Sequence, residues 1–97
     1  LNLIDHGMSL QEAVEAPRVW TEGNALEVEQ GVPDSVRARL TAMGHRIAVM
    51  ATVAGGMNGI AFNEDGTMLG AACWRADGTP VGMAGGLARA GVRFVLR

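Results

Sequence analysis

The sequence predicts an α+β protein made of two short helices and antiparallel strands. Three observations support this fold class: a helix-capping pattern at residues 9–12, an alternation of apolar and acidic residues over 25–29, and two apolar runs that flank Asp65-Gly66 as in a β-hairpin. The chain has 97 residues, of which 48% are hydrophobic and 19% charged, so its length and composition suit one modest core.

The first helix is predicted from its two ends. Ser9 and Glu12 form an S-x-x-E capping box, in which each side chain bonds to the backbone amide of the other residue. Pro17 disfavours helical geometry at the residue before it, so the helix should end there. One face of this helix carries Leu10, Ala13 and Val14.

The second helix is predicted to open at residues 31–34. Pro33 suits a first helical turn, and Asp34 favours the positive end of the helix dipole. Gly44 should end this helix as a C-terminal cap. We expect its buried stripe to consist of Val36, Leu40 and Met43.

Strands are predicted over 25–29 and 46–52, and in a hairpin formed by 59–62 and 68–72. In the first strand, the alternation points apolar residues inward and places Glu27 and Glu29 on the outer face. We therefore interpret these carboxylates as a solvated face rather than an acid–base pair. The hairpin strands are nearly continuous in small and apolar residues, which favours burial on both faces.

The composition excludes several classes of function. The net charge of −2 gives no general reason to expect binding to nucleic acid or to a membrane. All eight basic residues are arginine, which rules out lysine-based Schiff-base or phosphate-loop chemistry in this chain. No run approaches the roughly 18–20 apolar residues of a membrane helix, and no signal peptide is recognisable.

Few residues offer chemistry of their own. His6, His45 and Cys73 lack metal-ligand spacing, so we expect no metal and no cofactor. His45 suits a helix end, and Cys73 is interpreted as a small core residue whose pKa no sequence neighbour would lower. Ser9 is used by its cap. We therefore name no catalytic and no substrate-binding residue.

Arg18 and Arg75 are the two candidate site residues, and we predict structural support as their role. Each follows the end of an element, where a guanidinium can bond to main-chain carbonyls or to a carboxylate and hold two elements together. Contact with a substrate is the alternative.

The ends of the chain differ from its middle. Leu1 begins an apolar run, as though the chain were entered within an element. Residues 81–97 are glycine-rich, and their arginines recur every four residues at Arg89, Arg93 and Arg97. We expect a loose tail or an edge strand there rather than a basic membrane-surface helix.

An ordered set of motifs resembles one known family. It comprises Asn2–Met8, Gln11–Val14, Ala16-Pro17-Arg18, Leu26–Glu29, Leu40–His45, and Asp65-Gly66 with Leu69–Ala72. Together they resemble the C-terminal part of the small subunit of the γ-glutamyltranspeptidase family of N-terminal-nucleophile hydrolases. The resemblance covers roughly residues 1–80, which we take as that portion, and leaves 81–97 as an unmatched tail. Where the family usually ends its last strand with Asp-Pro-Arg, this chain has Cys73-Trp74-Arg75.

The resemblance implies a four-layer αββα sandwich and a self-cleaving proenzyme. A new N-terminal threonine of the small subunit attacks γ-glutamyl amides such as glutathione, with its own α-amino group as the base. The γ-glutamyl group then passes to water or to an amine. The nucleophile and its glycine pair find no match in this sequence, so we expect this chain to be a scaffold fragment, inactive alone.

The resemblance also implies binding partners for this chain and leaves two alternative functions open. The partners would be the rest of the small subunit and the large subunit, with a second copy of the chain as another partner for an exposed apolar face. Family members are often periplasmic or secreted in bacteria. A first alternative is a related acylase fragment, acting on a β-lactam side chain or a poly-γ-glutamate capsule. The second is a non-enzymatic remnant or assembly module.

Overall fold

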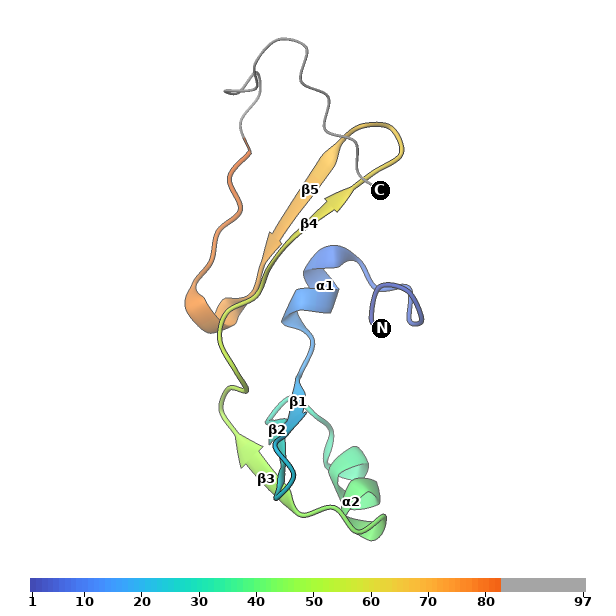
Figure 1. The fold of residues 1–97 in the computed structure, drawn as a ribbon, viewed down its shortest axis with the longest axis vertical. Coiled ribbons are helices and arrows are strands. Elements are labelled where there is room, and N and C mark those ends of the chain that lie inside the picture. The colour runs from blue at the N-terminus through green and yellow to red at the C-terminus, as the bar shows by residue number, and fades with distance from the viewer. Residues whose placement is uncertain (83–97) are drawn as a thin grey trace.

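The computed structural model describes residues 1–82 and contains two small sheets and two helices (Figure 1). The elements are α1 (Leu10–Glu15), β1 (Val19–Thr21), β2 (Leu26–Glu29), α2 (Asp34–Ala42), β3 (Ile47–Met50), β4 (Asn58–Phe62), β5 (Met68–Ala72) and a 3-10 turn at Trp74–Ala76. The predicted α+β class is confirmed. We predicted a loose tail or an edge strand for residues 81–97, with arginines every four residues. All of these residues except 81 and 82 lie outside the part of the chain that the structure describes.

The first sheet has the strand order β1-β2-β3. β1 pairs antiparallel with β2, whereas β2 pairs parallel with β3 in the register Leu26–Ile47 to Glu29–Met50. The parallel pair departs from the antiparallel arrangement that we predicted for all strands. Its cause is α2, which carries the chain back along the sheet between β2 and β3, as a parallel connection requires.

The second sheet is the predicted hairpin of β4 and β5, paired antiparallel from Asn58–Ala72 to Phe62–Met68. Its turn places Gly66 at φ +86°, a conformation that L side chains rarely adopt. The Gly66 amide donates to the Asn63 carbonyl at 3.0 Å and closes the turn. The Asp-Gly signal therefore identified this hairpin correctly.

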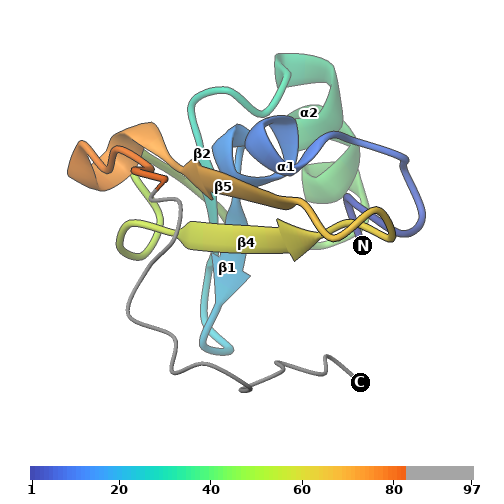
Figure 2. The ribbon, with the colours of Figure 1, turned by 90° about the horizontal axis from the view of Figure 1, so that it is seen from above.

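Helix α1 is capped at both ends as predicted. The Glu12 amide donates to Ser9 Oγ at 3.2 Å, and the Ser9 amide donates to Glu12 Oε2 at 2.8 Å. Ala16 leaves the helical region with ψ 143°, directly before Pro17. α1 lies across the hairpin, as Figure 2 shows. The resulting core contains Leu10, Val14, Ala71 and Cys73, with Ala61 packed against it.

Replacing Ser9 by Ala is expected to lower the free energy of unfolding by about 1 kcal/mol, because the Glu12 amide loses its side-chain acceptor. Urea denaturation followed by tryptophan fluorescence measures this change. Ser35 lies in the exposed first turn of α2, so Ser35→Ala serves as the matched control and should change the value by less than about 0.5 kcal/mol. Equal effects of the two substitutions would contradict the capping role.

The predicted buried stripe of α2 is wrong for the described residues. No residue of α2 is buried; Val36 is 41% exposed and Met43, which follows the helix, is 73% exposed. The helix contacts only β3 to any extent, so its apolar side chains lack a covering layer within residues 1–82. Its C-terminal end agrees with prediction, because Gly44 has φ +100° and its amide donates to Thr41 at 3.0 Å.

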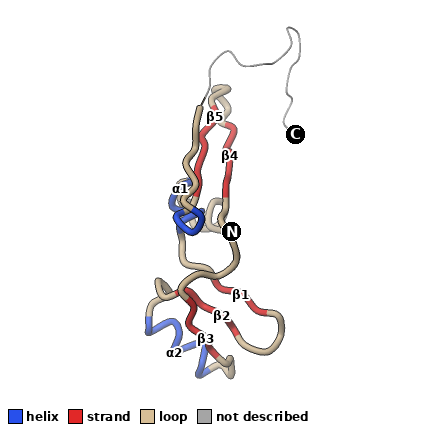
Figure 3. Tube along the Cα trace, turned by 90° about the vertical axis from the view of Figure 1, so that its left-hand side faces the viewer, coloured by secondary structure: helices blue, strands red, loops and turns tan. Residues whose placement is uncertain are grey.

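The predicted burial of the hairpin on both faces is also wrong for the described residues. Ile60 is 63% exposed and Met68 is 66% exposed, because α1 covers only one side. Figure 3 shows the reason for the limited burial: the hairpin and the three-stranded sheet occupy opposite ends of an elongated molecule. Within residues 1–82, no helix is both long and apolar enough to cross a membrane.

Candidate functional site

A buried ion pair joins the two sheets. Arg75, just after β5, donates from Nε and Nη2 to the two carboxylate oxygens of Glu29 at the end of β2, both at 2.5 Å. Its guanidinium also donates to the carbonyls of Val14 at 3.0 Å and Ala16 at 2.9 Å, where α1 ends. The side chains of Arg75 and Glu29 are 1% and 3% exposed. This one guanidinium therefore links β2, α1 and the end of the hairpin.

The solvated position predicted for Glu29 is wrong. Its carboxylate accepts two further bonds, from the amides of Arg18 and Val53, each at 2.9 Å. The Arg75 hydrogen bonds, helped by these two amides, lower the pKa of Glu29 from 4.5 to about 2 despite its burial. The carboxylate is therefore ionised at neutral pH and fully bonded.

Arg18 also bonds within this region, since its amide donates to Glu29. Its Nη1 donates to the carbonyls of Val53 at 3.1 Å and Gly55 at 2.6 Å, so it holds the glycine-rich connection between β3 and β4. Its Nη2 lies 3.7 Å from Cys73 Sγ. We call Glu29, Arg75, Arg18 and Cys73 together the Glu29 junction.

Cys73 is buried, as predicted, with 2% of its surface exposed. The expectation that no sequence neighbour would lower its pKa is wrong, because Arg75, two residues away, contributes. The Met57 amide donates to Sγ at 3.1 Å, and this bond, with smaller effects from Arg75 and Arg18, lowers the pKa of the thiol from 9.0 to about 7. Met57 and Arg18 lie 16 and 55 residues away in the sequence, so local sequence could not reveal their part in this effect.

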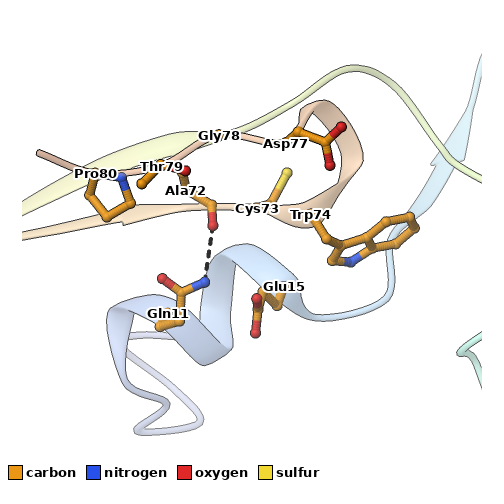
Figure 4. A pocket seen from close by; sticks show the side chains of 9 residues that line it. All are labelled: Gln11, Glu15, Ala72, Cys73, Trp74, Asp77, Gly78, Thr79 and Pro80. Atoms are coloured by element: carbon orange, nitrogen blue, oxygen red, sulfur yellow. Dashed lines mark hydrogen bonds between the residues drawn. The ribbon is translucent and has the colours of Figure 1, made fainter.

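A pocket of about 440 Å³ lies beside the junction (Figure 4). Gln11 reaches across from α1 and donates from Nε2 to the Ala72 carbonyl at 3.0 Å. Trp74 stacks against the Arg75 guanidinium, with 4.7 Å between Cζ and the ring centroid. The other lining residues are Glu15, Cys73, Asp77, Gly78, Thr79 and Pro80.

The remaining candidate residues stay apart. His6 precedes α1 and His45 follows α2, and both are exposed. Residues 1–82 hold no group of three or more His, Cys, Asp or Glu side chains placed to bind a metal ion. Ser9 is used by its cap. The structure therefore brings together Arg18, Arg75 and Cys73, and adds Glu29.

Glu29 is the residue that sequence reasoning missed. Period-two alternation assigns each residue to a face, but it does not say whether another segment covers that face. A usable signal was the pair of arginines at element ends, since a buried guanidinium needs an anion. With ten acidic residues in the chain, that requirement alone could not select Glu29.

Comparison with known proteins finds relatives of this chain in one family. The gamma-glutamyltranspeptidase family model matches residues 1–83. An acylase ACY 1 proenzyme of Pseudomonas sp. (strain V22) is 68% identical over 96 residues, covering 99% of this chain and 17% of the relative. A glutathione hydrolase proenzyme of Bacillus subtilis (strain 168) is 34% identical over 82 residues, covering 82% of this chain and 14% of the relative.

Solved structures agree with these matches. The fold superposes on an acivicin-inhibited gamma-glutamyltranspeptidase with a TM-score of 0.67 and 32% identity, covering 78% of this chain and 43% of that one. The curated relatives are much longer than this chain, which spans 17% and 14% of their lengths.

Proposed function

This chain belongs to the gamma-glutamyltranspeptidase family, and from that premise we propose that it is a scaffold part of an N-terminal-nucleophile enzyme that cleaves amides by acyl transfer. In this proposal a threonine in another part of the polypeptide attacks the amide, and its α-amino group takes up the hydroxyl proton. The acyl group then passes to water or to an amine. The partners are the rest of the small subunit and the large subunit.

The acylase branch of the family is the better supported of the two substrate classes. Identity to the acylase proenzyme is 68% over 99% of the chain, against 34% over 82% for the glutathione hydrolase proenzyme. This difference is the single observation that carries the choice. The family resemblance alone favoured a γ-glutamyl amide such as glutathione as the substrate. That substrate class becomes the second candidate.

The described residues support a scaffold role through the Glu29 junction. Arg75 and Arg18 bond to main-chain carbonyls of segments as distant in sequence as residues 14 and 55, and to the Glu29 carboxylate. The donors of both guanidinium groups are thus largely occupied by the protein itself. We therefore propose structural support, rather than substrate contact, as the role of Arg18 and Arg75. We also propose residues 1–80 as the scaffold unit, with 81–97 as a tail that the acylase relative shares.

A two-part assay tests this proposal. The purified chain alone is expected to release no p-nitroaniline from γ-glutamyl-p-nitroanilide or from glutaryl-p-nitroanilide, its analogue without the α-amino group. A heat-killed sample sets the background. Turnover clearly above that background by the chain alone would overturn the scaffold assignment.

The second part transplants the chain into its relatives. The matching part of the chain, 96 residues for the Pseudomonas acylase proenzyme and 82 for the Bacillus glutathione hydrolase proenzyme, replaces the corresponding segment of each host, and each host is assayed on its own substrate. We expect self-cleavage and activity to survive in the acylase host and to fall at least about tenfold in the other, because packing against the host must be retained. Survival in the glutathione hydrolase host alone would reverse the choice.

A further inference from the structure

The Glu29 junction contains more positive charge than its carboxylate neutralises. Two guanidinium groups, those of Arg18 and Arg75, enter it, and Glu29 pairs with Arg75. Within residues 1–82, Arg18 has no carboxylate within ion-pair distance, and its side chain bonds instead to two carbonyls and to the Cys73 sulfur. A second anion would balance the charge of Arg18, whose side chain is partly buried in this cluster.

Cys73 Sγ lies where that anion is needed. The Met57 amide donates to it at 3.1 Å and Arg18 Nη2 lies 3.7 Å away, so donors from two separate segments point at one sulfur. A neutral thiol is a weak acceptor, whereas a thiolate accepts such bonds readily. The sulfur is shielded from water, since Cys73 is 2% exposed.

The other charges around Cys73 do not reverse this balance. Glu15 of α1 and Asp77 after the 3-10 turn line the adjoining pocket, and both are exposed, so water screens their repulsion. Glu29 of β2 is compensated by Arg75. The connection from β3 to β4, which supplies the Met57 amide, has no titratable side chain between residues 51 and 57.

We propose that, at mildly alkaline pH, Cys73 is a thiolate in the folded protein and acts as the second anion of the Glu29 junction. It thereby neutralises Arg18 and fixes the 53–57 connection against the end of β5. Protonation of the sulfur removes this anion while Arg18 stays charged, so the junction weakens as pH falls.

The direction in which pH changes the stability of the folded chain follows from the lowered pKa of Cys73. The pKa of Cys73 is lowered to about 7 in the folded chain, from an ordinary value of 9.0. A lowered pKa stabilises the folded state fully above the ordinary value, and this stabilisation is lost as pH falls through the folded value. The contribution of Cys73 should therefore decrease from about pH 9 to about pH 7 and be absent below it.

The thiolate ultraviolet absorbance of the chain tests the proposal directly. Cys73 is the only cysteine and the chain has no tyrosine, so neither a second thiol nor tyrosinate interferes. We expect a titration midpoint near pH 7 in the folded chain and near pH 9 in urea. A folded midpoint at or above the midpoint in urea would overturn the proposal. Because this comparison uses the unaltered chain, it does not depend on any variant folding.

Substitutions of Arg18 and Cys73 distinguish the effect of the thiolate charge from the effect of side-chain packing. Arg18→Met should raise the folded midpoint toward its value in urea, because the cation facing the sulfur is lost. Cys73→Asp keeps an anion at pH 6, so its unfolding midpoint in urea should be the same at pH 6 and pH 8, whereas that of the unaltered chain should fall. Cys73→Ser should be less stable than the unaltered chain at pH 8. An unfolding midpoint in the Asp variant as low as in the Ser variant at both pH values would show that the charge is irrelevant.

Discussion

Replacing Arg75 by Met is expected to lower the free energy of unfolding by about 3–5 kcal/mol. Met keeps an apolar stem of similar length but leaves the Glu29 carboxylate buried without its cation. The carbonyls of Val14 and Ala16 also lose their donors. Since a domain of this size is stable by only about 5–15 kcal/mol, much of the variant should be unfolded at moderate urea concentrations.

Arg37 provides the matched control. It pairs with Asp34 on α2, where the Asp34 side chain is 91% exposed and the Arg37 side chain 24% exposed. Arg37→Met should therefore cost less than about 1 kcal/mol. The double variant Arg75→Met with Glu29→Gln should recover part of the lost stability, because the unpaired charge is gone. A loss at Arg75 as small as that at Arg37 would show that the buried pair does not hold the sheets together.

Acid is expected to destabilise the folded chain by protonating the Glu29 carboxylate. The folded pKa of this carboxyl is lowered from 4.5 to about 2, chiefly by the Arg75 hydrogen bonds. A lowered pKa stabilises the folded state above the unfolded value and loses that effect as pH falls through the folded value. We expect a loss on the order of 3 kcal/mol between about pH 4.5 and pH 2, measured from urea unfolding midpoints at a series of pH values.

Glu29→Gln isolates this effect. Glu12 and Asp65 also have lowered pKa values, held by hydrogen bonds to Ser9 and Thr67, so the unaltered chain carries some acid sensitivity from them. The Gln variant keeps those groups but has no titrating group at the junction. Its stability should be lower at pH 7 and should change less between pH 4.5 and pH 2. An equally steep acid dependence in both proteins would remove Glu29 as the cause.

The parts of the fold that the sequence predicted correctly are those encoded by neighbouring residues. The capping box at Ser9, the stop at Pro17 and the Asp65-Gly66 turn each depend on bonds spanning a few residues. The placement of Arg18 and Arg75 at element ends was equally readable. Local chemistry of this kind can be read without knowledge of the tertiary contacts.

The predictions that were wrong concern burial, which depends on whether another segment packs against the residue. Glu29 follows the alternation of an outer face, yet the Arg75 side chain and the Val53 amide cover it. Conversely, Val36 and Ile60 have the spacing of buried residues but remain exposed, because no described segment packs on them. The spacing of apolar and polar residues indicates which of them share one face of a helix or strand. Only tertiary contacts decide whether that face is exposed to water.

The wide separation of the residues bonded at the Glu29 junction has a consequence for the order of folding. Arg75 lies 46 residues after Glu29 and 61 after Val14, so closing these bonds requires long loops to be ordered first. During synthesis, α1, the β2-α2-β3 unit and the hairpin are all made before Arg75 leaves the ribosome. A chain released before residue 75 would lack the bonds by which this guanidinium links β2, α1 and the end of the hairpin.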